Sequence, residues 1–379
     1  MPVEFGYGPL GKALHIARAI RERAGDAVRL ELVASPTFQS PVGAGVFDAS
    51  SVDIASAAPA DATITVMNVQ GVRKAAGRGG NIYVVDSLAW LWDEPLPVQH
   101  LIHTYFYQDL PLLPVPARNL AGMPRPTPVG AIGDLRETPA LTAETRPRRI
   151  VISLSGLEAP GSRLGSGKIA YAPYILNALE VLVADGRLDV DDLSIFGNTA
   201  VLGRFAGERV KRAVRGGSQE AFFAAVRSAD AVICPPGLTT LVECLGAGIA
   251  PKLLPPQNYS QVKLMQAFGD ALDLPTMSWN SPVERWLRHA VLPEPVAAEM
   301  VRGIAALESQ SAGHADPARL LALIEQAPPA LDSAAVAAAL GPGGGAREVA
   351  DRVLSDLFRG GPPLGAVAAD AFGQAHAEG

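Results

Sequence analysis

Strand-like apolar runs alternate with helix-like runs along most of the chain, and this alternation constrains the fold more than any other feature. In the first part, the expected strands cover residues 3–5, 28–34, 62–67 and 81–85. A glycine-rich turn at residues 6–11 leads into a helix whose Leu14, Ala17 and Ile20 share one face. This order of elements predicts a parallel sheet with helices on both faces.

A second series of strands and helices begins at residue 149. Its expected strands cover residues 149–153, 193–196, 231–234 and 250–254, and its helices 171–183, 220–228 and 238–248. A last helix at residues 346–358 carries the apolar stripe Val349, Val353 and Leu357, before a tail expected to fray.

The two series are separated by a proline-rich segment. Eight prolines fall between Pro111 and Pro147, a density that helix interiors and central strands do not tolerate. We therefore predict a linker there and two domains, at residues 1–145 and 146–379. A length of 379 residues fits two ordinary domains.

Composition and charge exclude several classes of protein. The net charge is −6 and no basic tract is present, so nucleic-acid binding is not expected. The sequence shows no signal peptide and no apolar run near the length of a membrane span, which predicts a cytoplasmic protein. The two cysteines, Cys234 and Cys244, make neither a disulfide framework nor a metal-ligand set, and we expect two small buried side chains.

The most informative stretch covers residues 228–251. A buried strand runs into Gly237, and a helix opens at once with Thr239 and Thr240. The first turn of a helix has unpaired amides and a partial positive charge, so it suits a pyrophosphate. Gly237 allows close approach of the backbone, and the threonines add hydroxyl donors.

Three further polar residues follow this turn. Glu243 lies one turn into the helix, where a carboxylate can accept hydrogen bonds from ribose hydroxyls. Its spacing from Thr240 also fits a capping box, in which the glutamate only turns back to its own helix start. Asn258 and Gln261 are expected at the carboxyl end of the next strand, where ligands of open α/β sheets bind. As an alternative, Gln261 is an ordinary exposed polar residue.

The order of strand, glycine, threonine, glutamate, Gly-x-Pro and late glutamine resembles the donor motif of GT-B glycosyltransferases. It is most similar to bacterial enzymes that add N-acetylglucosamine in peptidoglycan synthesis and to natural-product sugar transferases. The resemblance implies two doubly wound, Rossmann-like α/β domains that face each other across a cleft. It also implies that Glu243 holds the ribose, that Gly237, Thr239 and Thr240 hold the diphosphate, and that Gln261 contacts the sugar.

The loop after the strand at residues 149–153 contains Ser155 and Gly156. In the GT-B families a Gly/Ser loop at this place faces the diphosphate, so the resemblance adds both residues to the donor site. The alternative is an ordinary turn between a strand and a loop.

The first domain departs from the family pattern. Its glycine loop keeps Gly8 and Gly11, but Pro9 stands where the resemblance predicts a histidine. His15, farther along the helix, is interpreted as a structural histidine. Asp86, at the end of a strand, matches an aspartate that orients the family's histidine.

Asp86 is therefore our first candidate for the acceptor-side base or for its orienting partner; a helix cap is the alternative. His100 and His103 are the next candidates. These two could instead mark a zinc site, although the sequence offers no third ligand.

The resemblance implies transfer of a sugar from a nucleotide-diphosphate sugar, most simply a UDP-sugar. The acceptor would be a hydroxyl-bearing small molecule or a lipid-linked one. The reaction is expected to invert the anomeric centre and to need neither metal nor cofactor. Two alternatives stay open: a nucleotide-sugar hydrolase or epimerase on the same fold, and a non-catalytic nucleotide-sugar-binding partner subunit.

Overall fold

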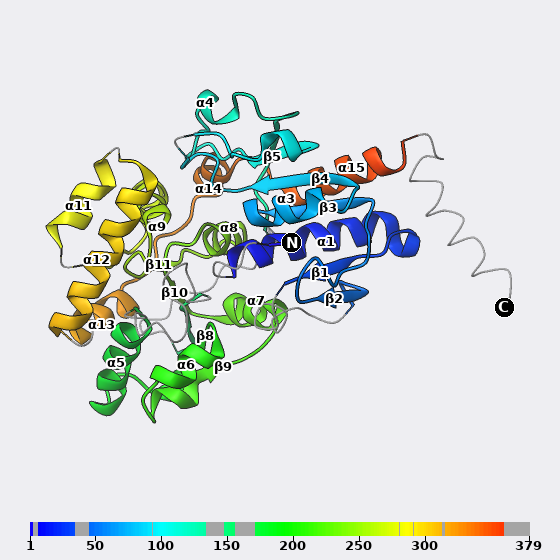
Figure 1. Cartoon of the computed structure of the whole chain (residues 1–379). Helices are drawn as coiled ribbons and strands as arrows, with labels where there is room; N and C mark the ends of the chain where they lie inside the picture. Colours follow the sequence, from blue (N-terminus) through cyan, green and yellow to red (C-terminus); the bar gives the residue numbers. More distant parts are fainter. Residues whose placement is uncertain are drawn as a thin grey trace, which may run out of the picture.

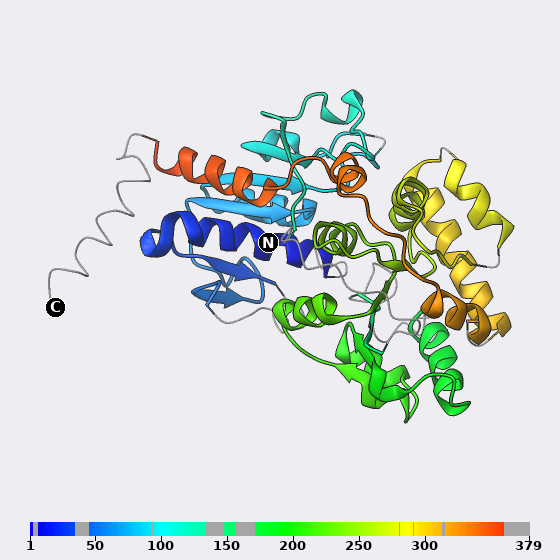
Figure 2. The same cartoon turned by 180° about the vertical axis from the view of Figure 1, so that it is seen from behind.

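The chain folds into two α/β lobes (Figures 1 and 2). The computed structural model describes residues 1–2, 7–34, 45–92, 94–133, 148–155, 171–279, 281–290, 292–312 and 315–359. Each lobe is built around a parallel sheet with helices packed against it. The predicted fold class, α/β with two Rossmann-like sheets, is therefore confirmed.

The sheet of the first lobe has the order β3-β4-β5-β6, and all of its strands are parallel. These strands are β3 (Ala62–Val66), β4 (Asn81–Asp86), β5 (Thr104–Gln108) and β6 (Thr127–Val129). The chain begins beside β3, where the Met1 ammonium donates a hydrogen bond to the Ile64 carbonyl at 2.7 Å. A separate pair of parallel strands consists of β1 (Glu31–Val33), which lies within the strand predicted at residues 28–34, and β2 (Ala49–Ser51), which was not predicted. The predicted strand at residues 3–5 lies outside the described residues.

The helices of the first lobe include α1 (Gly8–Ala24), α3 (Val69–Ala76) and α4 (Ala117–Leu120). Helix α1 begins at Gly8, so part of the predicted glycine turn is the first turn of the helix. Pro9 stands at the start of α1, where its missing N–H has no intrahelical partner to lose. Gly8 and Gly11 consequently lie within a helix and not in a loop.

The last helix, α15 (Gly345–Leu357), packs against the first lobe, beside α1 (Figure 1). Val349 and Val353 share an apolar cluster with Ile16 and Ile20 of α1 and with Val85 of the sheet. The sequence predicts this helix as part of the second domain, whereas the structure packs it against the first lobe. Its apolar stripe is complementary to a face that only the first lobe provides.

Much of the proline-rich segment also belongs to the first lobe. It contributes α4 and β6, and Pro128 lies within β6. Since β6 is an edge strand of its sheet, the proline costs no internal hydrogen bond. The linker interpretation is therefore wrong for residues 109–133. Residues 134–147 lie outside the described part, so the boundary near residue 145 stays a prediction.

The sheet of the second lobe has the order β11-β10-β7-β8-β9, again all parallel. Its strands are β7 (Ile150–Ser153), β8 (Leu193–Phe196), β9 (Val214–Arg215), β10 (Ala231–Cys234) and β11 (Lys252–Leu253). From β7 the chain adds β8 and β9 on one side, then crosses to add β10 and β11 on the other. The strand order therefore reverses between β7 and β10, and ligands of doubly wound sheets bind outside the carboxyl ends of the strands at such a point.

Helices surround this second sheet. They are α5 (Tyr171–Ala184), α6 (Thr199–Phe205), α7 (Gln219–Ser228), α8 (Leu238–Gly246), α9 (Tyr259–Leu264), α10 (Asp270–Leu272), α11 (Pro282–His289), α12 (Glu294–Ala312), α13 (Pro317–Glu325) and α14 (Ser333–Leu340), with a π-helical turn at Met265–Gly269. None of the helices in the described ranges is both long enough and apolar enough to span a bilayer. Cys234 and Cys244 are free and buried, as predicted.

Candidate functional site

The candidate site centres on the start of α8, which follows β10 at the reversal of the sheet. Gly237 caps α8 without any side-chain hydrogen bond to the first turn. A Cβ built on Gly237 would meet no described atom closer than 3.9 Å, at the Pro235 carbonyl oxygen. Among the described residues, the turn is therefore open on this side, with the amides of the first helical turn and their partial positive charge beside it.

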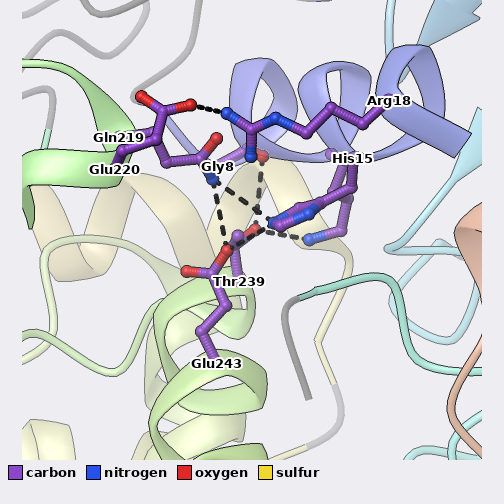
Figure 3. Close-up of polar contacts among 8 residues, drawn as sticks. Gly8, His15, Arg18, Gln219, Glu220, Thr239 and Glu243 are labelled. Carbon is purple, nitrogen blue, oxygen red and sulfur yellow. Dashed lines mark hydrogen bonds and ion pairs between the residues drawn. The ribbon is translucent and has the colours of Figure 1, made fainter. Parts of the chain in front are cut away.

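Helix α1 of the first lobe approaches this turn closely (Figure 3). A Cβ on Gly8 would lie 3.1 Å from the Thr239 hydroxyl oxygen, and one on Gly11 would lie 3.0 Å from the Gln219 amide nitrogen. A side chain at either position would be in tight contact with these groups, so Thr239 or Gln219 would have to shift to make room for it. The glycines thus permit the close approach of the lobes. The sequence predicts Gly8, Pro9 and Gly11 in an acceptor-side loop, whereas in the structure all three lie in the first turns of α1.

Thr239 connects the two lobes. Its hydroxyl donates to the Gly8 carbonyl at 3.3 Å and accepts a hydrogen bond from the Lys12 ammonium. Thr240 lies next to it and is half-buried. Both predicted phosphate-binding threonines therefore lie at the start of α8, one against α1 and the other partly open to solvent.

Lys12 is 2% exposed, and its ammonium lies against the start of α8 through its contact with Thr239. Burial lowers the pKa of Lys12 from 10.5 to about 8, with the nearby Glu243 carboxylate acting in the opposite direction. The loss of hydration opposes the charged form more than Glu243 supports it.

Glu243 points from α8 toward α1 (Figure 3). Its Oε1 lies 2.9 Å from His15 Nε2 and accepts from the Gln219 amide of α7 at 3.3 Å. Glu243 is only 4% exposed and His15 only 9%. Because α8 begins at Leu238, after the cap at Gly237, the capping-box alternative for Glu243 is wrong.

Sequence reasoning did not identify Lys12 and Gln219, and it interpreted His15 as merely structural. The sequence of α1 does contain a pattern that could have identified Lys12 and His15, because one helix face carries two glycines followed by three basic residues at helical spacing. Those residues are Gly8, Gly11, Lys12, His15 and Arg18, and each contacts α7 or α8. Arg18 completes the series through an ion pair with Glu220 of α7.

Other predicted donor residues occupy local structural roles. Ser155 follows β7, adopts a φ of 62°, and its carbonyl accepts from the Asn198 amide at 3.2 Å. Asn258 caps α9 by accepting from the Gln261 amide at 3.1 Å. The Gln261 side chain turns back to the Gln257 amide at 2.7 Å. Gly156 lies outside the described residues.

Asp86 lies at the end of β4, as predicted, but its carboxylate is 2% exposed. One oxygen accepts from the Leu88 amide at 2.7 Å. The other accepts from the Trp92 indole at 2.9 Å and from the Tyr105 hydroxyl at 2.8 Å. Burial raises the pKa of Asp86 against the effect of these bonds. These contacts do not support a role as base, which stays a prediction.

The two histidines downstream lie apart from the α1–α8 contact. His100 is exposed in a short 3-10 turn. His103 lies against α15, with Nε2 at 3.4 Å from the Asp356 carboxylate and 2.8 Å from the Arg125 guanidinium. Within the described ranges, no group of three histidine, cysteine or carboxylate side chains is arranged to hold a metal.

Comparisons with known proteins give matches among solved structures alone. No protein-family model matches the chain, and no curated protein sequence matches it. It is similar to MurG from Acinetobacter baumannii, with 15% identity and a TM-score of 0.38, over 83% of this chain and 95% of that one. It is also similar to CalG4, the calicheamicin glycosyltransferase, with 14% identity and a TM-score of 0.37, over 89% of this chain and 97% of that one.

Proposed function

We propose that the chain transfers a sugar from a nucleotide-diphosphate sugar, most simply a UDP-sugar, to a hydroxyl-bearing small-molecule or lipid-linked acceptor. The observation that carries the proposal is the polar start of α8 at the reversal of the second sheet. An open glycine turn, two threonine hydroxyls and the buried Glu243 occur together there. This is the place and the chemistry that a nucleotide diphosphate requires.

In the proposed complex, the diphosphate contacts Gly237 and the amides of the first turn of α8. The ribose hydroxyls replace His15 as partners of Glu243. The acceptor oxygen forms a bond to the anomeric carbon from the opposite face as the bond to the diphosphate breaks, so the centre is inverted. The acceptor proton passes to a base, and the positive end of α8 stabilises the departing diphosphate without a metal.

A nucleotide-sugar-binding subunit without transfer activity is the second candidate. The hydrogen bonding of Asp86 favours this second candidate, because all of the partners described for this carboxylate lie within its own lobe. The donor-side residues do not depend on Asp86, so a chain of this kind would bind the nucleotide sugar normally.

A two-step assay tests the proposal. Thermal melting is first measured with a panel of nucleotide sugars, since a ligand that binds only the folded state raises Tm. Release of nucleotide diphosphate from the best ligand is then measured with and without an acceptor panel. Acceptor-dependent release is expected. Release into water alone indicates a hydrolase, binding without release indicates the subunit, and the absence of any Tm shift contradicts the proposal.

A further inference from the structure

The boundary between the lobes contains a buried ammonium whose described hydrogen bond goes to a neutral hydroxyl, while the nearby Glu243 carboxylate offsets only part of the cost of burial. Lys12 is 2% exposed, and in the described part of the chain the Thr239 hydroxyl is the one acceptor of its three N–H donors. A buried charge is costly unless it is paired. An ammonium that makes a single hydrogen bond to a neutral hydroxyl is only partly compensated.

The position of this ammonium is one where an anion would be bound. Thr239, which it contacts, is the second residue of α8, directly after the open Gly237 turn. The first-turn amides of α8 and its partial positive charge act at the same place. Lys12 therefore adds a full charge, from the other lobe, to a helix start that already attracts anions.

We propose that Lys12 binds the diphosphate of the nucleotide ligand across the lobe boundary, together with Thr239 and the first-turn amides of α8. The inference rests on the proposed function for the identity of the ligand. It assigns to the first lobe a part in donor binding that the sequence had placed entirely in the second. Donor binding then holds the two lobes together through one shared anion.

A second buried lysine provides a matched control. Lys252 of β11 is also 2% exposed, and burial likewise lowers its pKa to about 8. Its ammonium, however, donates to the Ile324 carbonyl within the second lobe. Lys252→Met removes the same charge from a similarly buried position that is not at the start of α8.

Lys12 could instead be purely structural, and stability separates the two roles. A lysine that only joins the lobes would lower Tm when replaced. A lysine kept for an anion leaves Tm unchanged or raised in Lys12→Met, because an apolar side chain of similar length removes the cost of burying a charge. Lys12→Gln, which removes the charge but keeps a polar side chain, serves if the methionine variant does not fold.

The test is calorimetric titration of the full chain with UDP and with inorganic pyrophosphate. We compare the unmodified chain with Lys12→Met, Lys12→Arg and Lys252→Met. Lys12→Met should weaken both ligands by about 10- to 100-fold, the usual range for a charge-assisted hydrogen bond. Lys12→Arg should stay within about fivefold of the unmodified chain because it keeps the charge. Lys252→Met should bind both ligands normally.

Equal affinity of the unmodified chain and Lys12→Met for both ligands would overturn the inference, as would failure of the unmodified chain to bind either one. The outcome is independent of sugar transfer. If Lys12→Met alone loses pyrophosphate but no sugar transfer is found, the anion site stands and the proposed function fails. If sugar transfer is found and Lys12→Met keeps full affinity, the proposed function stands and the anion site at Lys12 fails.

Discussion

Two buried charged clusters in this molecule differ in where their partners lie. The Asp86 carboxylate receives all three of its described hydrogen bonds from the first lobe. The cluster of Lys12, His15 and Glu243 is made from both lobes. Partners from a carboxylate's own lobe persist as long as that lobe is folded. Partners across a lobe boundary can be exchanged for a ligand without unfolding anything, so the second cluster is the better candidate for binding.

The largest effect is expected when the Asp86 cluster is broken. Asp86→Ala removes the acceptor of three buried donors, one of them the Tyr105 hydroxyl. Each donor that stays unsatisfied costs about 1–3 kcal/mol, so we expect a loss of roughly 2–4 kcal/mol in the free energy of unfolding. Urea denaturation of the purified chain measures it.

The matched variant Asp86→Asn separates stability from catalysis, because it keeps the size of the side chain. If the three local donors hold Asp86 in a structural role, as the comparison indicates, turnover per folded molecule stays normal in this variant. A fall in turnover of roughly 10²–10⁴-fold with the fold intact, as expected for loss of a general base, would show that Asp86 acts at the acceptor after all.

The next effect concerns the pH dependence of UDP affinity. With a pKa of about 8, Lys12 loses its proton as the pH rises above neutrality. Glu243 of α8 and His15 of α1 are the titratable groups beside it. We expect affinity to fall by roughly tenfold between about pH 7 and 9.5 as that charge is lost. The fall should be absent in Lys12→Arg, which stays charged, and an equal fall there would contradict the assignment.

Stability of the ligand-free chain should change in the opposite direction. The pKa of Lys12 is lower in the folded state, about 8, than its ordinary value of 10.5. The unfolded chain therefore binds more protons between these values, and the contribution of Lys12 to stability rises with pH across this window. Lys12→Met should lack this contribution.

A smaller effect is expected at His15. If ribose replaces His15 as the partner of Glu243, the contact at 2.9 Å must first be broken. His15→Ala removes this competitor, so we expect UDP to bind about two- to fivefold more tightly, corresponding to a net hydrogen bond of about 0.5–1 kcal/mol. Calorimetry at pH 7 measures the change. A weaker affinity would instead place His15 among the residues that hold the ligand.

The smallest effect is expected at Arg18. Its ion pair with Glu220 joins the same two lobes but is partly exposed to solvent, and such pairs contribute about 0–1 kcal/mol. Arg18→Ala should therefore change both Tm and UDP affinity only slightly. A loss of UDP affinity comparable to that of Lys12→Met would show that the whole face of α1 determines binding, and not only its buried part.

The strands and helices beside the site could be predicted from local sequence. The strand at residues 231–234 is a continuous apolar run that ends at prolines and a glycine, so both β10 and the start of α8 were found. The apolar stripe of α15 could also be predicted from the sequence. The lobe against which that stripe packs could not be predicted, because an apolar face does not specify its partner in the sequence.

The cluster between the lobes could not be predicted in the same way. Lys12 and Thr239 are 227 positions apart, and His15 and Glu243 are 228 apart. Periodicity shows which residues share a face of one helix and cannot show which faces meet. Asp86 illustrates the converse, because its position at a strand end was predicted correctly while its three local donors were not.

The central claim is that the start of α8 binds a nucleotide diphosphate through groups now engaged across the lobe boundary. Its most direct test is calorimetric titration of UDP into the unmodified chain and into Glu243→Gln, with Tm recorded for both. The account predicts binding to the unmodified chain and a loss of about 1–3 kcal/mol in the variant, the usual worth of charge-assisted hydrogen bonds to ribose. The melting temperature should stay nearly the same. A chain that does not bind UDP, or a variant that binds it equally well, would contradict the account.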